Sequence, residues 1–397
     1  MTAKNAQDIV FVAAKRTPFG AFNGQLKSLS ATDLAVKASQ AALTQGGISP
    51  ELIDHVIFGN VLQTSQDAIY LARHVGLRSE VPQKVPALTV NRLCGSGFEA
   101  IIVGAKELKL GEAKAVLVGG TESMSQAPHV IRGMRDGATF GRPPELEDSL
   151  WSCLTDSYTG FPMGITAENL AEQYEITRDD CDQYAVRSQE AWAAAHERGA
   201  FKNELSAVEI SHRRGNVIVD QDEHPRASSL EALAKLRPAF KKEGVVTGAN
   251  ASGICDGAAA MVMTTREMAE REGWKPIGKL VSYGVSGCDP KIMGIGPVPA
   301  SKIALERAQM SMSHMSLVEV NEAFAPQYIA VEKALGLNRE ITNVNGGAIS
   351  LGHPLGASGA RITAHLLYAL AERGEHIGLG SACIGGGQGI AVIVEVE

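Results

Sequence analysis

The sequence lacks what marks several large protein classes. No apolar run reaches the ~18 residues that a membrane-spanning helix requires. Lys and Arg number 37 against 44 Asp and Glu, and the net charge of −7 does not suit a nucleic-acid-binding surface. We therefore expect no membrane span and no nucleic-acid partner.

Cysteine is also sparse. The six cysteines lie far apart, at positions 94, 153, 181, 255, 288 and 383, and no two have the spacing of zinc ligands. We therefore expect no metal site. Dispersed thiols, with no signal peptide expected ahead of the first strand, suit a reducing compartment.

One stretch departs from the acidic balance. Residues 224–242 carry five Lys or Arg against one Glu. Two interpretations stay open for this stretch: a solvated helix face, or a docking strip for a small polyanion.

Strand-like and helix-like segments alternate along the chain. Apolar runs predict strands at 8–18, 55–61, 85–93 and 114–123. Helices are predicted at 31–47 and 97–113. Thr32 or Asp33 can cap the first helix, and Gly46 and Gly47 end it. The alternation predicts an α/β fold with a largely parallel sheet.

The second half of the chain repeats this pattern. Segments 89–111 and 342–374 both read as strand, glycine-rich turn and helix, and 300–324 echoes the early helix and strand. Residues 121–245 carry more charge and read as an inserted cap. We predict three units: an N-terminal half of residues 1–120 plus 246–275, an inserted loop domain of residues 121–245, and a C-terminal half of residues 276–397.

Four residues that can carry chemistry stand where predicted strands give way to turns: Cys94, Asn321, His353 and Cys383. Loops that follow strands are where α/β proteins place their sites. Because Cys94 and His353 occupy corresponding loops of the two repeats, these loops can meet at a pseudo-twofold interface. Each residue also has a structural interpretation: a buried cysteine in a tight turn, a turn-closing asparagine, a structural histidine, and a plain hairpin turn after Cys383.

Cys94 is a candidate nucleophile. It precedes Gly95, Ser96 and Gly97, which read as a tight turn that opens a helix. A helix N-terminus or a neighbouring imidazole can lower the pKa of a cysteine to between roughly 3.5 and 7.5. A glycine-rich turn also leaves backbone N–H groups free to stabilise an oxyanion.

Four motifs, in order along the chain, resemble those of the thiolase family: NRLCGSGFEA (91–100), VNEAFAPQ (320–327), NVNGGAISLGHPLGASG (343–359) and GSACIGGGQG (380–389). Residues 59–78 and 285–300 are similar to the mitochondrial-type 3-ketoacyl-CoA subgroup. The resemblance implies a thiolase-like α/β fold with two duplicated halves in five αβαβα layers and an inserted loop domain. It also implies a homodimer or homotetramer, located in the cytoplasm if bacterial or, alternatively, in the mitochondrial matrix.

The resemblance further implies roles for individual residues. Cys94 would be the nucleophile that carries the acyl group, and His353 would activate it. Cys383 would be the second acid/base, which moves protons at the α-carbon and at the CoA thiol. Asn321 would hold a water that completes an oxyanion hole with His353. The backbone N–H groups of Cys94 and Gly385 would form a second oxyanion hole.

Coenzyme A and acyl-CoA are the implied partners, with CoA a co-substrate rather than a permanently bound cofactor. By similarity, Arg226 and a following hydroxyl, Ser228 or Ser229, contact the nucleotide part of CoA. Ser252 and Met163 are implied to line the pantetheine channel.

The implied reaction is CoA-dependent cleavage of a 3-ketoacyl-CoA to acetyl-CoA and a shortened acyl-CoA, together with the reverse Claisen condensation. One alternative is a biosynthetic thiolase specific for acetoacetyl-CoA, but Pro162 stands where those enzymes carry a histidine. A thioester hydrolase would have no use for Cys383, although hydrolysis as a side activity stays open. A CoA-binding scaffold would fit a chain without Cys94 or His353, and ketoacyl synthases use a single cysteine.

Overall fold

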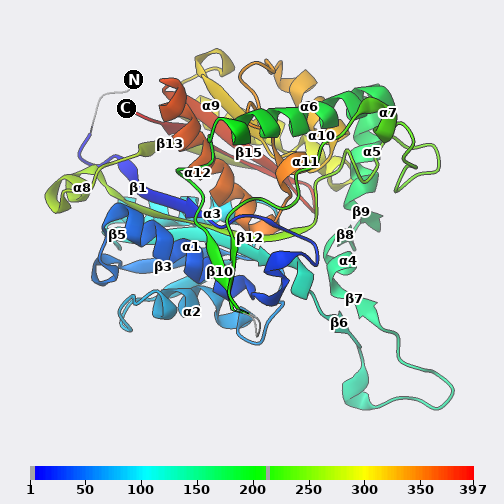
Figure 1. Ribbon diagram of the computed structural model, residues 1–397, viewed down its shortest axis with the longest axis horizontal. Helices are drawn as coiled ribbons and strands as arrows, with labels where there is room; N and C mark the ends of the chain where they lie inside the picture. The colour runs from blue at the N-terminus through cyan, green and yellow to red at the C-terminus, as the bar shows by residue number, and fades with distance from the viewer. Residues whose placement is uncertain (1–4, 212–214) are drawn as a thin grey trace.

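The computed structural model describes residues 5–211 and 215–397, and its body is a stack of five alternating helical and sheet layers (Figure 1). Two helices, α3 (Ser96–Leu110) and α12 (Leu355–Arg373), pack on each other in the central layer. Each contacts strands of the flanking sheets. The outer layers are formed by α1 (Ala31–Gly46) and α2 (Leu71–Arg78) on one side and by α9 (Pro297–Ala308) and α10 (Ala325–Leu335) on the other.

The first half of the chain forms one of the two sheets, together with one strand that follows the insert. Its strands are β1 (Ile9–Arg16), β3 (His55–Gly59), β4 (Ala87–Val90), β5 (Ala115–Ser123) and β12 (Cys255–Thr265). Their order across the sheet is β4-β3-β5-β12-β1. β3 runs parallel to β4 and β5, whereas β12 is antiparallel to β5 and β1.

The last third of the chain repeats this topology. Its strands are β13 (Gly278–Gly287), β14 (Leu317–Val320), β15 (Ile377–Ile384) and β16 (Gln388–Glu395). Their order is β14-β15-β16-β13, and a parallel bridge between Val318 and Thr342 occupies the place that β4 has in the first half. β14 is parallel to β15, and β16 is antiparallel to β15 and β13. The predicted duplication is therefore confirmed.

The prediction of a largely parallel sheet is wrong, because each half ends in antiparallel strands. β15 turns into β16 through Gly385, Gly386 and Gly387, and two strands joined by so short a turn can only be antiparallel. The two sheets meet along β1 and β13, which pair over only two residue pairs, Val10 with Lys279 and Phe11 with Gly278.

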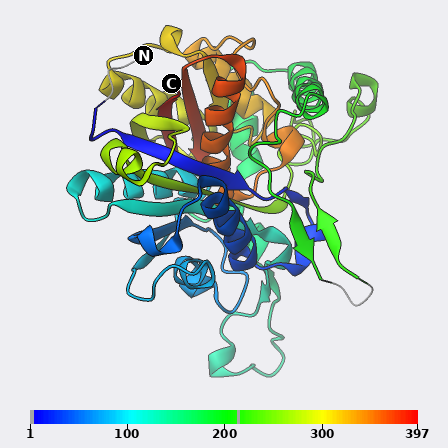
Figure 2. The ribbon, with the colours of Figure 1, turned by 60° about the vertical axis from the view of Figure 1, so that its left-hand side comes forward.

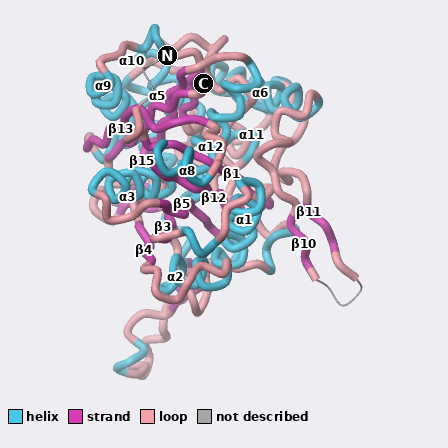
Figure 3. The backbone as a smooth tube through the Cα atoms, turned by 90° about the vertical axis from the view of Figure 1, so that its left-hand side faces the viewer, coloured by secondary structure: helices cyan, strands magenta, loops and turns pink. Residues whose placement is uncertain are grey.

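The segment between β5 and β12 covers the second half with two helices, which pack on α10 and on α11 (Ala348–Leu351), and extends beyond the stack elsewhere. Its helices and strands are β6 (His129–Val130), β7 (Glu147–Asp148), α4 (Ser149–Cys153), β8 (Thr155–Asp156), β9 (Phe161–Pro162), α5 (Met163–Gln173), α6 (Arg178–Glu197), β10 (Val208–Ile210), β11 (Val217–Val219) and α7 (Leu230–Leu233). Residues 129–148 form an arm that projects from the body, and the β10–β11 hairpin projects separately (Figures 2 and 3).

The remaining elements are short. They are β2 (Gly20–Ala21), α8 (Arg266–Glu272), α11 (Ala348–Leu351) and the 3₁₀ turns Gln25–Ser28, Pro50–Leu52, Ala68–Tyr70, Met124–Gln126, Met134–Asp136, Pro290–Ile295 and Met312–His314. Within the described residues, no helix is long and apolar enough to cross a membrane.

The start of α1 differs from the prediction. Ser30, rather than Thr32 or Asp33, caps the helix: its hydroxyl accepts the Asp33 N–H at 3.0 Å, and the Asp33 carboxylate accepts the Ser30 N–H at 2.9 Å. This reciprocal pair is a capping box. Gly47, with φ 61°, ends the helix as predicted.

The two central helices approach closely at their first turns. A Cβ on Gly97 of α3 would lie 2.5 Å from the backbone nitrogen of Ala360, and a Cβ on Gly359 of α12 would collide with the backbone of Phe98. Glycine at both positions therefore lets the two helix starts, and the loops that precede them, come together between the sheets.

A buried ionic cluster joins the insert to both halves. Arg16 of β1 donates to Glu204 at 2.6 Å and to Asp222 at 2.6 Å, and both carboxylates belong to the insert. Glu204 also contacts Nδ1 of His365, on α12, at 2.7 Å. All four side chains are buried, so their charges balance one another out of contact with water.

Candidate active site

Cys94 lies in a tight turn between β4 and α3, as predicted. Asn91 Oδ1 accepts the Leu93 N–H at 2.9 Å, and Leu93 adopts a left-handed φ of 46°. The Ser96 hydroxyl accepts the Arg92 N–H at 2.8 Å and closes the turn. The sulfur of Cys94 accepts a hydrogen bond from the backbone N–H of Gly385, in the other half.

The thiol of Cys94 is neutral in the resting enzyme. Burial raises its pKa to about 11, the negative charge of Glu122 adds to the rise, and the Gly385 N–H acts in the opposite direction. The expectation that a helix N-terminus lowers this pKa is therefore wrong, because the sulfur is out of water and faces a carboxylate rather than a cation.

His353 occupies the loop between α11 and α12. Its Nδ1 lies 2.6 Å from the Ser358 hydroxyl, and its Nε2 lies 3.4 Å from Asn321 Nδ2. Burial, together with the nearby charge of Arg361, lowers the pKa of His353 to about 3, so the imidazole is neutral and able to accept a proton.

Asn321 follows β14 and is buried. Within the described part of the chain, its Oδ1 has no hydrogen-bond partner. A buried amide oxygen without a protein partner is a site for an ordered water, which would lie next to the imidazole of His353.

Cys383 is the penultimate residue of β15 and is fully buried. Burial raises the pKa of its thiol well above the usual value, and the nearby Cys94 and Cys288 add to the rise. Gly386 and Gly387, with φ 76° and 82°, form the hairpin turn that follows. The structure thus brings Cys94, His353 and Asn321, each from a loop, together with Cys383 near the end of β15, and the four residues come from both halves.

A cavity of about 380 Å³ reaches one member of this group, His353. His353 and Ser252 lie in its wall, and most of the remaining wall is apolar, including Trp151, Phe240 and Phe324. An apolar cavity with a few polar groups at one end suits a small-molecule chain that delivers a polar reacting group.

The residues expected to contact CoA lie around this cavity in different ways. Arg226 donates to the carbonyl of Gly248, a residue of the cavity wall, at 3.0 Å. The Ser229 hydroxyl caps α7, while the Ser228 hydroxyl is 3.5 Å from the Arg226 carbonyl. Met163 packs in one cluster with Cys383 and Phe324, on the side of the second cysteine.

Two positioning residues of the site escaped the sequence analysis. Ser358 holds the ring of His353 from the first turn of α12. Glu322, beside Asn321, is buried and accepts the Tyr184 hydroxyl at 2.7 Å and the Ile349 N–H at 3.0 Å. The only signal for either was proximity in sequence to a candidate residue.

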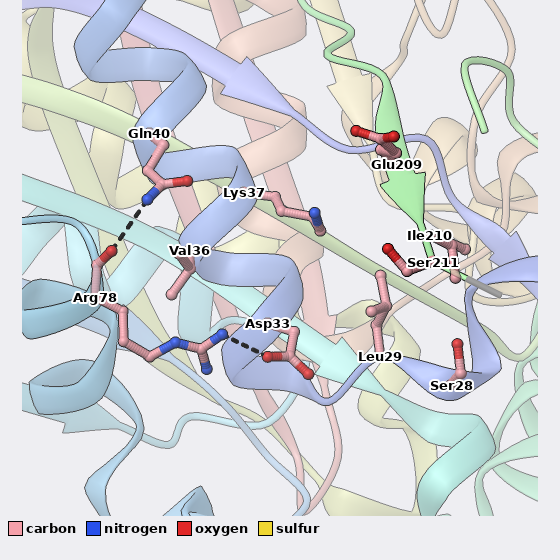
Figure 4. Close-up of a pocket in the computed structure, with 10 residues that line it drawn as sticks. All are labelled: Ser28, Leu29, Asp33, Val36, Lys37, Gln40, Arg78, Glu209, Ile210 and Ser211. Carbon is pink, nitrogen blue, oxygen red and sulfur yellow. Dashed lines mark hydrogen bonds and ion pairs between the residues drawn. The ribbon is translucent and has the colours of Figure 1, made fainter. Parts of the chain in front are cut away.

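A second hollow is separate from this site. It lies between α1, the end of α2 and β10, where Arg78 pairs with Asp33 at 2.6 Å (Figure 4). The residues that line it include Lys37 and Glu209 but none of the predicted site residues. In the described residues, no group of three or more His, Cys, Asp or Glu side chains is arranged to hold a metal ion.

Comparisons with known proteins agree with this geometry. Residues 9–267 match the family described as thiolase, N-terminal domain, and residues 274–396 match thiolase, C-terminal domain. The chain is 56% identical over 388 residues, 98% of each chain, to the mitochondrial 3-ketoacyl-CoA thiolase of Homo sapiens. It is 46% identical over 393 residues to an acetyl-CoA acetyltransferase of Syntrophomonas wolfei, covering 98% of this chain and 99% of that one. A crystal structure of the human mitochondrial enzyme in complex with CoA matches with a TM-score of 0.96 and 55% identity, covering 99% of this chain and 98% of that one.

Proposed function

The chain belongs to the thiolase family, and from that premise we propose that it cleaves 3-ketoacyl-CoA with CoA to acetyl-CoA and a shortened acyl-CoA. The reverse Claisen condensation uses the same groups by microscopic reversibility. The observation that carries the proposal is the grouping of two neighbouring thiols, a neutral imidazole and an unsatisfied amide oxygen, with the imidazole in the wall of an apolar cavity.

The first half of the reaction forms an acyl-enzyme. His353 takes the proton of Cys94 as the sulfur attacks the 3-keto carbon, which suits a resting pair of neutral thiol and neutral imidazole. The backbone N–H groups of Cys94 and Gly385 stabilise the tetrahedral oxyanion. Breaking the bond between C2 and C3 leaves the acyl group on Cys94 and releases the enolate of acetyl-CoA.

The enolate and the second substrate require a further acid/base. The negative charge on the thioester oxygen is met by His353 and by a water held on Asn321. Cys383 protonates C2, becomes a thiolate, and then deprotonates the incoming CoA thiol. The CoA sulfur attacks the acyl group, the bond between that group and Cys94 breaks, and Cys94 takes back its proton from His353. Two cysteines are required because Cys94 is occupied as the thioester during this step.

The cavity has a lining that suits CoA as the co-substrate. Its apolar wall suits the pantetheine arm, with Ser252 as a polar contact and Met163 near the thiol end. Arg226 at the rim, with Ser228 or Ser229, supplies charge and a hydroxyl for the nucleotide phosphates. A hydrolase is not favoured because hydrolysis has no use for Cys383, and Pro162 argues against an acetoacetyl-CoA-specific enzyme.

We further propose the domain division at residues 1–120 plus 246–275, 121–245 and 276–397. The pairing of β12 with both β5 and β1 supports returning the chain to the first half after the insert. We assign the enzyme to the cytoplasm if bacterial or, alternatively, to the mitochondrial matrix.

A homodimer or homotetramer is the proposed assembly. β4 is the edge strand of its sheet, and apolar Leu88, Ile69 and Tyr70 are exposed on or near it. An unpaired edge beside apolar side chains suits pairing with a second copy. The exposed Phe140 and Leu146 of the arm offer a second surface, suited to joining two dimers.

Trapping the acyl-enzyme tests the proposed function. Incubation with acetyl-CoA, followed by peptide mass spectrometry, is expected to show one acetyl group on Cys94 that disappears when free CoA is added. The Cys94→Ser variant, which keeps a hydroxyl in place of the thiol, serves as the control and is expected to stay unlabelled. Label on Cys383 alone, or acyl release at the same rate without CoA, would contradict the assignment.

A further inference from the structure

Glu122 is a buried carboxylate that takes no part in the proposed acyl transfer. It lies near the end of β5 and is fully shielded from solvent. Its Oε1 accepts the Leu62 N–H at 2.9 Å and the Asn60 amide at 3.0 Å. Its Oε2 accepts the Val61 N–H at 3.1 Å and the Gly356 N–H at 3.0 Å. One side chain therefore holds a loop of the first half and the start of a helix of the second.

The loop on one side supports the nucleophile. Val61, which donates to Glu122, accepts the Asn91 side-chain amide on its carbonyl at 3.2 Å. Asn91 in turn accepts the Leu93 N–H at 2.9 Å, and Leu93 directly precedes Cys94. The position of the Cys94 turn is thus fixed to Glu122 through three consecutive hydrogen bonds.

The helix on the other side supports the base. Gly356 is the second residue of α12, and Ser358 lies in the same turn. The Ser358 hydroxyl contacts Nδ1 of His353 at 2.6 Å, so a shift of this turn moves the imidazole. Burial raises the pKa of Glu122 to about 7, while the backbone N–H groups that donate to it act in the opposite direction. Its oxygen accepts the Gly356 N–H at a helix N-terminus, where first-turn N–H groups lack partners.

We propose that Glu122 is a positioning residue that fixes the Cys94 turn relative to His353 across the two halves. The inference rests on the proposed function, because it assigns to Glu122 the geometry of that reaction. Its effect is on turnover rather than on CoA affinity, since none of its contacts reaches the wall of the cavity at Ser252 or the rim at Arg226.

The Glu122→Gln variant tests this role. It keeps the size of the side chain but replaces one acceptor oxygen by an NH₂ group that faces N–H donors. Because small misplacements of reacting groups can cost about 10²-fold, we expect kcat for thiolysis to fall roughly 10- to 100-fold. KM for CoA is expected to change little, whereas Tm is expected to fall, because two buried N–H donors lose their acceptor. An unchanged kcat, or a loss confined to KM, would overturn the proposal.

Asp256→Asn is the matched control. Asp256 is a buried carboxylate on the neighbouring strand β12, and its charge raises the pKa of Glu122. It accepts the Ser125 N–H at 2.9 Å and so does not hold the Cys94 turn or the start of α12 by this bond. Its kcat is expected to stay close to that of the wild type. An equal loss of kcat in both variants would assign the effect to the lost buried charge and refute positioning by Glu122.

Asn91→Ala keeps the inference testable if Glu122→Gln does not fold. Asn91 is exposed, so its variant should fold, and it removes the link between Val61 and the Cys94 turn. We expect a lower kcat in this variant and no further loss when it is combined with Glu122→Gln, because both break one chain of contacts. Unchanged kcat in Asn91→Ala, or losses that simply add, would overturn the inference.

Failure of the proposed function can be distinguished from failure of the positioning role of Glu122. A wild-type enzyme without thiolysis would refute that function alone. Alkylation of Cys94 by iodoacetamide would then judge the positioning role in Asn91→Ala, which leaves the charge of Glu122 and its effect on the pKa of Cys94 in place. This variant is expected to react at least about threefold more slowly than the wild type, because the Cys94 turn is no longer held toward His353. Equal alkylation rates would refute it.

Discussion

Replacing Glu204 with Gln should reveal how strongly the buried ionic cluster stabilises the fold. Glu204 is 1% exposed, accepts Arg16 Nε at 2.6 Å and contacts His365 Nδ1 at 2.7 Å. Burial alone would raise its pKa, but the positive charges of His365 and Arg16 outweigh that effect and lower the pKa from 4.5 to about 2.

The size of this pKa shift gives the loss of stability expected for Glu204→Gln. A change from 4.5 to about 2 corresponds to about 3 kcal/mol of folding free energy. At roughly 2.1 cal/mol/K of unfolding entropy per residue, a chain of this length loses about 4 °C of Tm for that amount. Because the folded pKa is depressed, the stabilisation is complete above pH 4.5 and is lost as the pH falls toward 2.

Differential scanning fluorimetry of wild type and Glu204→Gln at several pH values is the assay. We expect a gap of about 4 °C at pH 7 that shrinks by about half by pH 3, because below pH 4.5 the Glu204 carboxyl becomes protonated in the unfolded chain while it stays mostly ionised in the folded one. Glu147→Gln is the control: Arg132 lowers the pKa of Glu147 to about 2 as well, but this pair lies on the exposed arm. Water screens an exposed pair, so no measurable change in Tm is expected. A gap at pH 7 no larger than in the control, or one that widens on acidification, would refute the reasoning.

Three further predictions concern the site and its support. Cys383→Ala should lower kcat for thiolysis by about 10²- to 10⁴-fold, the usual worth of a general acid/base, and unchanged steady-state turnover would contradict its role. Gly97→Ala should destabilise the protein by about 1–3 kcal/mol in urea unfolding, because its Cβ would press on the backbone of α12; equal stability would show that the helices can separate freely. Since burial holds the pKa of Cys94 at about 11, its alkylation by iodoacetamide should rise about tenfold per pH unit from pH 7 to 9, and a plateau in this range would disprove a neutral resting thiol.

Much of the architecture was accessible from the sequence because it depends on local patterns. The alternation of apolar runs predicted β1, β3, β4 and β5 together with α1 and α3, but not α2, and the repeated glycine-rich turns predicted the duplication. Strand direction was not accessible, since an apolar run has the same pattern in either orientation. The antiparallel course of β12 and β16 depends on how the chain returns to the sheet.

The candidate site was predicted as a set of residues but not in its electrostatics. Each of Cys94, Asn321, His353 and Cys383 stood at the end of a predicted strand, where sites are expected. The pKa of Cys94 was not predictable, because it depends on burial by residues of the other half. The link between Glu122 and Gly356 joins residues 234 positions apart, a separation over which sequence spacing carries no information.

The division of the reacting groups between the two halves has a consequence for how such an enzyme can arise. Cys94 belongs to the first half, whereas Asn321, His353 and Cys383 belong to the second. Two identical copies of one ancestral half, related by a twofold rotation axis, would place the same side chains on both sides of the interface between them. Each copy can change independently only when the two are encoded by separate stretches of DNA. The division of the reacting groups therefore required duplication of the coding sequence before the two halves specialised.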